Sequence, residues 1–426
     1  MRLSALPNLI SRRLTVLFAL GLALSARARV SAADLEPPVG DRSASAGIFT
    51  PAPELARATA SENGSGSAWE NPTTGDSRLG HESDLSGYRQ LGSFDEKVLM
   101  ADFCPDEKGL LLATTDGSRI RIYRLQDGIK PVVTYRPPGF ARIHSLRWWR
   151  PAPAAEPYLV VTATRSAGTT FGTTQELELN GLVLKLAAEQ LIPVADSLDY
   201  LLGSFDRDGD GQRESLLGQS VELDGFFGHI KGLTFSAGRL KADRAAINFP
   251  PGFPAPAGLV ADLTGTGELE SIFVRKGMLI IARNGKPLVQ FGKGLGGSLS
   301  QLTYDLNPGQ SNALFTTVAF EVPPVAADLN GDGQLELLTV ASEQATGFSL
   351  AGSPEIVRSR LVAFWYQQGS FRKSYLTEEL DMPIQGIYVD KNRLLLVVVD
   401  PAPADAASPI SRLLSVSLPA VSGGER

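Results

Sequence analysis

The chain has 426 residues, enough for one large domain or two ordinary ones. Asp and Glu outnumber Lys and Arg by 46 to 40, and the resulting net charge of -6 argues against a nucleic-acid-binding surface. The single cysteine, Cys104, excludes an intrachain disulfide and a cysteine-cluster zinc site. We expect Cys104 to be a small buried apolar residue, because free cysteine is usually buried.

Residues 1–33 have the layout of a secretory signal peptide. Arg12 and Arg13 precede an apolar stretch over residues 14–26, and small-residue cleavage options follow it. The apolar stretch is too short to span a bilayer comfortably. The sequence therefore predicts export, to the periplasm or the extracellular surface of a bacterial cell, with no membrane span in the mature chain. A retained signal anchor and the twin-arginine export route are the alternatives.

The rest of the chain divides by composition. Residues 34–85 are rich in Pro, Gly, Ser, Ala and charged residues, so we expect a disordered linker that cannot bury a core. Residues 86–420 consist of short runs of strand-forming residues separated by turn residues, with almost no sustained helical periodicity. Residues 421–426 form a C-terminal tail.

The strand-like runs recur in units of about four strands, spaced about 40 to 60 residues apart, which is typical of the blades of a β-propeller. We count six units and predict an all-β propeller of six four-stranded blades, with seven as the alternative. The segment 301–321 would be a shortened seventh unit or an inserted hairpin. The last unit has only three clear strands, and "GYRQLGSF" (residues 87–94) is expected to close the ring as its outer strand.

Two acidic loops, "DRDGDGQRE" and "DLNGDGQLE", each follow one apolar run and precede another. Alternate spacing turns the side-chain oxygens of loop positions 1, 3 and 5 toward one point, position 7 can add its backbone carbonyl, and position 9 adds a carboxylate. Calcium prefers such a shell of oxygens, and glycine at position 6 permits the sharp turn. We therefore predict that these loops bind Ca²⁺ through Asp206, Asp208, Asp210, Gln212 and Glu214 in the first, and Asp328, Asn330, Asp332, Gln334 and Glu336 in the second.

A third loop, "DLTGTGELE", departs from this pattern. Asp262 and Glu270 keep positions 1 and 9, but Thr264 and Thr266 replace the acids at positions 3 and 5. Asp262 and Glu270 are candidate calcium ligands, and the lower charge predicts weaker binding. The EF-hand is excluded for the two complete loops, because it needs Glu at position 12 and a flanking helix on each side.

The residues "DRDGDGQRE" and "DLNGDGQLE", between two apolar strands, resemble the FG-GAP/VCBS repeat. This repeat forms the calcium-loop blade of integrin α-subunit propellers and of many secreted bacterial proteins. The resemblance implies that each loop joins the first two strands of a blade and binds calcium on one face of the propeller.

The sequence contains no clear catalytic motif. "GKGLGG" at residues 292–297 matches GxGxxG formally, but it does not open a helix in a strand–helix–strand unit, and we interpret it as a mobile loop. Trp148, Trp149 and Trp365 could stack on sugars, but we expect them to fill gaps between blades.

We therefore predict a non-enzymatic binding, adhesion or scaffold module, monomeric on its own, with a protein or glycan partner at the cell surface. A carbohydrate lyase or hydrolase and a lectin, each using the central mouth of the propeller, are the alternatives. Acids together with Lys, Arg or Tyr in one funnel would favour the enzyme, and an aromatic shelf would favour the lectin.

Overall fold

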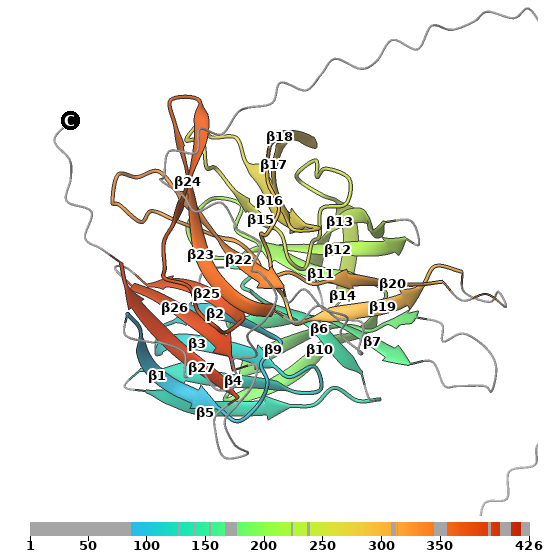
Figure 1. Ribbon diagram of the computed structural model, residues 1–426. Helices are drawn as coiled ribbons and strands as arrows, with labels where there is room; N and C mark the ends of the chain where they lie inside the picture. The colour runs from blue at the N-terminus through green and yellow to red at the C-terminus, as the bar shows by residue number, and fades with distance from the viewer. Residues whose placement is uncertain are drawn as a thin grey trace, which may run out of the picture. The chain divides into compact units, whose positions relative to one another are not determined.

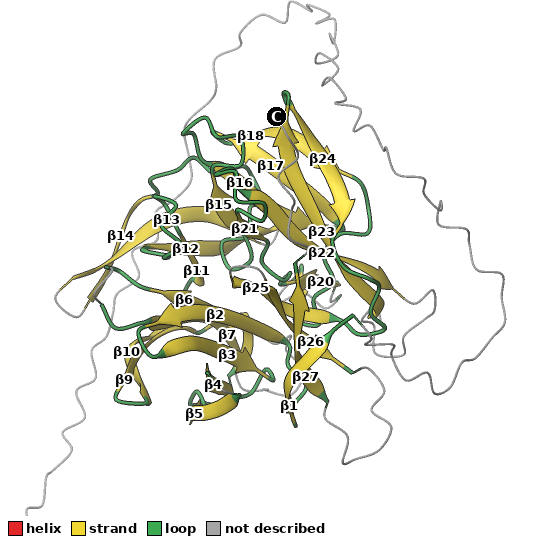
Figure 2. Cartoon of the chain, turned by 90° about the vertical axis from the view of Figure 1, so that its left-hand side faces the viewer, coloured by secondary structure: helices red, strands yellow, loops and turns green. Residues whose placement is uncertain are grey.

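Strands joined by turns and loops make up the part of the chain that the computed structural model describes, and no helix occurs there (Figure 2). These are residues 87–418, except 127, 140, 153–154, 167–176, 223–224, 237–238, 308–311, 313, 345–355, 391–392 and 401–409. The predicted signal peptide, linker and C-terminal tail lie outside the described residues. Among the described residues, no helix is long and apolar enough to cross a membrane.

Six antiparallel sheets, each with a path of four strands, form the blades of a propeller (Figure 1). Blade 1 consists of β2 (Met100–Asp106), β3 (Gly109–Thr115), β4 (Ile120–Leu125) and β5 (Ile129–Tyr135). Blade 2 consists of β6 (Arg142–Trp149), β7 (Tyr158–Ser166), β9 (Gly181–Ala187) and β10 (Gln190–Leu198), and the short β8 (Leu177–Leu179) also pairs with β7. Blade 3 consists of β11 (Leu201–Phe205), β12 (Ser215–Glu222), β13 (Phe226–Ser236) and β14 (Arg239–Arg244).

The remaining three blades follow the same antiparallel order. Blade 4 consists of β15 (Leu259–Ala261), β16 (Glu270–Arg275), β17 (Met278–Arg283) and β18 (Lys286–Phe291). Blade 5 consists of β21 (Val325–Ala327), β22 (Glu336–Gln344), β23 (Ile356–Gln367) and β24 (Ser370–Tyr375). Blade 6 consists of β25 (Ile384–Asp390), β26 (Arg393–Val399), β27 (Ser411–Ser417) and β1 (Arg89–Phe94). The prediction of six blades is confirmed.

Blade 6 closes the ring with strands from both ends of the described chain. β1 pairs antiparallel with β27, from Arg89 opposite Ser415 to Phe94 opposite Ser411. Phe94 is 3% exposed and packs with residues of blades 1 and 6. The predicted role of residues 87–94 as the missing outer strand is therefore confirmed, and the pairing covers an edge of β27 that would otherwise be open.

The cores lie between neighbouring blades, as expected for sheets that cannot each bury both faces alone. Six apolar clusters occupy the six interfaces around the ring. Trp148 and Cys104 are buried between blades 1 and 2, and Trp149 is buried between blades 2 and 3. These three residues are core residues, as predicted, while Trp365 in β23 is only partly buried.

An inserted hairpin, β19 (Gln301–Asp305) and β20 (Phe315–Ala319), lies in the chain between blades 4 and 5. It forms a sheet of two strands, so the segment is a hairpin and not a seventh blade. Leu302, Tyr304 and the following Phe320 pack with Met100 and Leu201, which begin the inner strands of blades 1 and 3. The hairpin therefore covers the inner strands at the face where those strands begin.

Candidate functional site

The three acidic loops join the first and second strands of blades 3, 4 and 5. Residues 206–214 connect β11 to β12, residues 262–270 connect β15 to β16, and residues 328–336 connect β21 to β22. Each loop therefore follows an inner strand and lies at the same face of the propeller, opposite the face covered by the hairpin.

The first Asp organises each loop through backbone amides. In the first loop, the carboxylate of Asp206 accepts hydrogen bonds from the amides of Gly209 and Gly211, both at 2.7 Å. These glycines have φ angles of +80° and +86°, which are strained for other residues, so the DG repeat supplies the required turns. Asp328 accepts the corresponding bonds in the second loop, at 2.7 and 2.9 Å.

The glutamate at position 9 folds back onto each loop. In all three loops its carboxylate accepts a hydrogen bond from the amide at position 2, as in Arg207 to Glu214, Leu263 to Glu270 and Leu329 to Glu336. The three loops therefore share one backbone framework, and they differ mainly in the side chains at positions 3 and 5.

The carboxylates of the first complete loop are placed as a hard cation requires. The carboxylate oxygens of Asp206, Asp208 and Asp210 lie within 4.8 Å of one another. Burial raises the pKa of Asp206, and the charges of Asp210 and Asp208 raise it further against the two backbone hydrogen bonds. Burial likewise raises the pKa of Glu336. A bound divalent cation would relieve this repulsion and supply a partner for the clustered oxygens.

The third loop contains an internal cation in place of extra acids. The guanidinium of Arg283, from β17, donates from Nε to Glu270 Oε1 at 2.9 Å and from Nη2 to Thr264 Oγ1 at 2.6 Å. Its Nη1 forms an ion pair with Glu268 at 3.1 Å. Arg283 thus contacts loop positions 3, 7 and 9, where the oxygens of a calcium loop would converge.

The strand register explains why only this loop has an arginine. Glu270 at position 9 pairs directly with Arg283 across β16 and β17. Continuing the register of the other two blades places Phe235 opposite Glu214 and Trp365 opposite Glu336. An aromatic residue therefore stands beside each complete loop, and a guanidinium stands beside the loop with two threonines.

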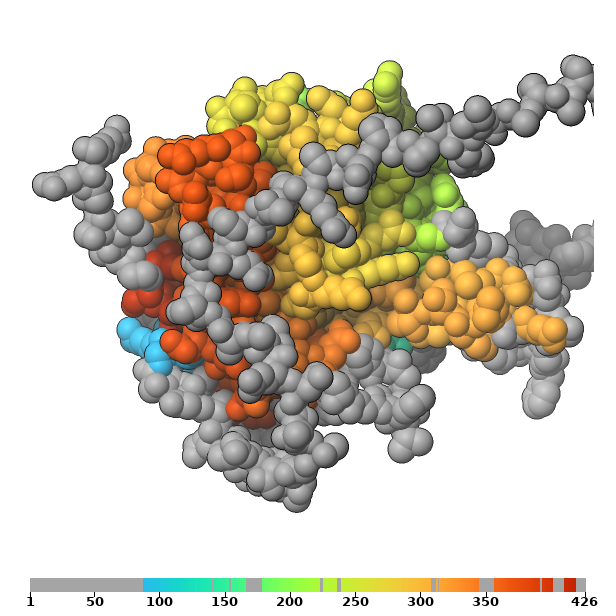
Figure 3. Space-filling view, turned by 45° about the horizontal axis from the view of Figure 1, so that its top comes forward, coloured from blue at the N-terminus to red at the C-terminus, as the bar shows by residue number. Residues whose placement is uncertain are grey.

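A pocket of about 1090 Å³ lies on the face opposite the loops. Its walls come from the hairpin, from the crossing 293–298 between blades 4 and 5, from the start of β13, from the β16–β17 turn, and from the end of β22 with the start of β23. In the space-filling view the light orange of the hairpin lies beside the yellow of residues 250–300 (Figure 3). The charged, polar and aromatic residues of its lining include Arg275, Lys276, Lys293, Ser298, Gln301, Tyr304, Thr316, Glu321, Lys373 and Tyr375.

Glu321 is a partly buried acid in this pocket. Its Oε2 accepts hydrogen bonds from the amides of Gly297 at 2.8 Å and Ser298 at 3.3 Å. Burial raises the pKa of Glu321, while the two amides act in the opposite direction. Among the described residues, no cationic side chain forms an ion pair with it. Both amide hydrogen bonds engage Oε2, so Oε1 of Glu321 is free to accept a hydrogen bond from a ligand.

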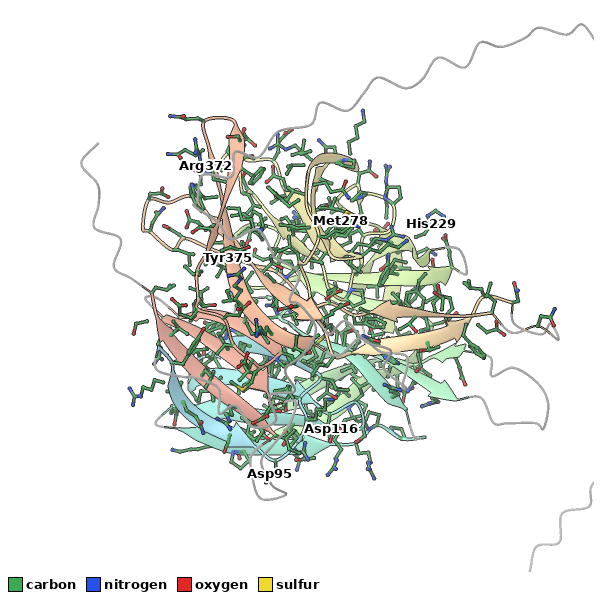
Figure 4. The ribbon with its side chains drawn as sticks, viewed as in Figure 1. Asp95, Asp116, His229, Met278, Arg372 and Tyr375 are labelled. Carbon is green, nitrogen blue, oxygen red and sulfur yellow. The ribbon has the colours of Figure 1, made fainter. Side chains whose placement is uncertain are left out.

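Four cationic side chains surround the pocket, Arg275, Lys276, Lys293 and Lys373, and none forms an ion pair with another described residue. Tyr375 is 46% exposed, with the guanidinium carbon of Arg360 3.4 Å from its ring centre. Figure 4 shows Tyr375 toward the body of the propeller and Arg372 nearer the tip of the β23–β24 hairpin. The pocket thus offers positive charge and one accessible aromatic ring.

No sequence pattern predicted this pocket, although the stretch "GKGLGG", which forms one of its walls, is a visible motif. The stretch "GKGLGG" opens no helix, as expected, and crosses between blades with φ of +93°, +94° and +140° at its last three glycines. The amide of Leu295 donates to Gly277 O and that of Gly296 to Val340 O, which joins blades 4 and 5. The glycines indicated a tight backbone turn from the sequence alone. Glu321 is 24 residues from Gly297, so no local sequence pattern predicted that the two would meet.

No family model matches the chain, and no curated protein matches it. The chain is similar to several solved structures at low identity. A PQQ-bound aldose sugar dehydrogenase from Streptomyces coelicolor is 13% identical with a TM-score of 0.38, covering 78% of this chain and 97% of that one. BBS1N in complex with ARL6DN is 12% identical with a TM-score of 0.33, covering 76% and 79%.

A hypothetical selenium-binding protein from Sulfolobus tokodaii is 10% identical, with a TM-score of 0.36 and coverage of 78% of both chains. Likenesses of this size carry no argument about ligand, partner or activity.

Proposed function

We propose that this protein is an exported, calcium-stabilised β-propeller that binds a glycan in the pocket beside Glu321. It would act as a non-enzymatic binding module in the periplasm or at the cell surface. The observation that carries the proposal is the pocket itself, which combines an exposed tyrosine with several polar groups in a hollow of about 1090 Å³. Ligand sites are typically concave, with a few placed polar groups beside apolar and aromatic ones.

The polar groups suit hydroxyl-rich ligands. Ser298, Gln301 and Thr316 bring hydroxyl and amide groups to the pocket, and Glu321 has one oxygen not engaged by the amides of Gly297 and Ser298. Arg360 covers one face of the Tyr375 ring, and the remaining exposed part of the ring would be available to a sugar. A concave site of this kind supports a glycan better than a flat protein partner, which the sequence left open.

Calcium would support the site from the opposite face. The complete loops belong to blades 3 and 5, and residues of β13 in blade 3 and of β22, β23 and β24 in blade 5 line the pocket. In this proposal the metal stabilises the blades and does not contact the ligand. The ligands are those predicted from the sequence, while the third loop has Arg283 in the metal's place.

A glycan microarray of neutral and acidic oligosaccharides, probed in millimolar calcium, tests the proposal. Thr316→Trp places a large ring in the pocket, and Phe315→Trp is the matched control, because Phe315 is exposed on the same strand outside the pocket lining. We expect the wild type and Phe315→Trp to bind the same glycans and Thr316→Trp to lose at least tenfold in affinity. Binding to no glycan, or equal binding by Thr316→Trp with an unchanged melting temperature, would contradict the proposal.

A second candidate is a carbohydrate lyase or hydrolase, which is favoured because the pocket combines Glu321 with Arg275, Lys276 and Tyr375. Burial raises the pKa of Glu321, which favours the protonated form that a general acid needs. Release of reducing ends or unsaturated sugars from polysaccharides by the wild type, abolished in Glu321→Gln, would replace the binding module with the enzyme.

A further inference from the structure

A buried guanidinium lacks a partner near the inner strands of the propeller. Arg147 lies on β6, the first strand of blade 2, and is 2% exposed. Its Nε has no hydrogen-bond partner among the described residues, and its guanidinium forms no ion pair with any of them. A buried, unpaired charge is among the most destabilising features a fold can contain, so such a group needs an explanation.

The nearest carboxylate does not satisfy Arg147. Asp102 attracts it, but Asp102 Oδ2 already accepts a bond from Arg213 Nη1 at 2.5 Å and from the amide of Trp148 at 2.8 Å. Arg150 also lies in this region, and its Nη2 donates to the carbonyl of Pro105 at 3.0 Å. Asp102 is therefore already engaged by Arg213, and no hydrogen bond joins it to Arg147.

Arg147 remains positively charged at neutral pH. Burial lowers the pKa of its guanidinium to about 9, and the charge of Arg213 lowers it further against the attraction of Asp102. This pKa is still above 7, so the guanidinium stays protonated at neutral pH and its buried charge remains unpaired.

A second polar group without a partner stands next to it. Ser145 is fully buried, and its Oγ has no partner among the described residues. Ser145 and Arg147 pair with Thr162 and Val160 in one unbroken register, so both side chains point to the same side of β6. Their Cα atoms are about 7 Å apart, as for any residues two apart in a strand. A hydroxyl donor and a cation without partners thus lie on the same side of β6, one strand repeat apart.

We propose that a small inorganic anion binds inside the propeller between Arg147 and Ser145. Chloride or phosphate would accept hydrogen bonds from the guanidinium and the hydroxyl, and would neutralise the excess positive charge. This site is separate from the pocket and from the calcium loops, so it does not depend on the proposed function. Ordered water alone would satisfy the hydrogen bonds but not the charge, and the experiment distinguishes the two.

Thermal melting at constant ionic strength tests the site, with sodium gluconate replaced stepwise by chloride or phosphate. We expect the wild type to melt at least about 2 °C higher in chloride or phosphate than in gluconate. Arg147→Met should lose this anion dependence and melt in gluconate no lower than the wild type. Arg142→Met is the matched control, since Arg142 is exposed on the same strand, and it should respond as the wild type does.

No anion dependence in the wild type, or an undiminished one in Arg147→Met, would overturn the proposal. If Arg147→Met shows no cooperative melting, anomalous diffraction from wild-type crystals soaked in bromide decides the question. A bromide peak within hydrogen-bond distance of Arg147 supports the site, and its absence from that position refutes it.

Discussion

Arg283 Nε lies 2.9 Å from Glu270 Oε1, directly across the strand pair that begins at the third acidic loop. In a calcium loop the glutamate at position 9 would contact the metal, and here the guanidinium takes that place. The single charge of Arg283 can balance a loop with few acids, whereas a divalent ion would balance the three carboxylates of Asp206, Asp208 and Asp210. The three loops therefore differ in two features together. One is the charge at loop positions 3 and 5, and the other is the residue opposite the glutamate at position 9.

Calcium stoichiometry should follow this difference, with two ions bound per chain. Asp208→Ala and Asp332→Ala each remove a charged ligand from a complete loop, so each should lose one calcium in calorimetric titration. Thr266→Ala in the third loop should leave the stoichiometry unchanged. Equal losses in all three variants would show that the third loop binds metal despite Arg283.

A third calcium site should be created by copying the complete loops. The variant Thr264→Asp/Thr266→Asp/Arg283→Phe restores the two acids and places Phe where blade 3 has Phe235. We expect it to bind one more calcium than the wild type in equilibrium dialysis. Thr264→Asp/Thr266→Asp with Arg283 kept is the control and should bind no extra ion, because the guanidinium still occupies the loop.

Calcium should stabilise the fold, and the effect should grow with pH. Each site adds about 2.7 kcal/mol to the free energy of unfolding at a hundredfold excess over Kd. The raised pKa values of Asp206, Glu214 and Glu336 mean that the calcium-free fold prefers these carboxyls protonated, so it loses stability as the pH rises through the folded values. Calcium binds the ionised form and offsets this loss.

The measurement is differential scanning calorimetry of demetallated protein with and without millimolar calcium, at pH 5 and pH 7.5. We expect a larger rise in melting temperature at pH 7.5. A melting temperature that calcium does not change at either pH would refute calcium binding by both complete loops.

Removal of β1 should destabilise the propeller far more than removal of the segment before it. A chain starting near Leu85 keeps β1, whereas one starting near Lys97 loses the outer strand of blade 6 and the buried Phe94. Loss of the Phe94 side chain alone is expected to reduce stability by about 3–5 kcal/mol, and β27 would gain an open edge. Thermal melting and light scattering should show the shorter chain melting much lower or aggregating. Equal melting of the two chains would mean that β1 is dispensable.

Phe320 should hold the inserted hairpin onto the blades. Its side chain is fully buried, and its ring stacks on His144 of β6 with 5.2 Å between ring centres. Phe320→Ala should lower the free energy of unfolding by about 3–5 kcal/mol in urea denaturation. The exposed Phe315 on the same hairpin is the control, and Phe315→Ala should change stability by less than about 0.5 kcal/mol. Similar losses in the two variants would show that the hairpin is not anchored through Phe320.

The sequence by itself determined the repeat and its strands. Alternating apolar runs and Asp-Gly turns encode local backbone geometry, so six blades could be counted before any pairing was known. Even the closure by residues 87–94 could be predicted, because the last unit lacked one strand and an open edge is unfavourable. The acidic loops were visible for the same reason, since their ligands lie within nine residues of one another.

Tertiary structure alone decided what stands beside these elements. Arg283 belongs to the third loop only because the register of β16 and β17 pairs it with Glu270. Glu321 became a pocket residue through bonds to Gly297 and Ser298, and Arg147 was shown to lack a partner only when the blades came together around it. Such relationships join residues far apart in the chain, and side-chain burial and charge balance there depend on packing that no local pattern encodes.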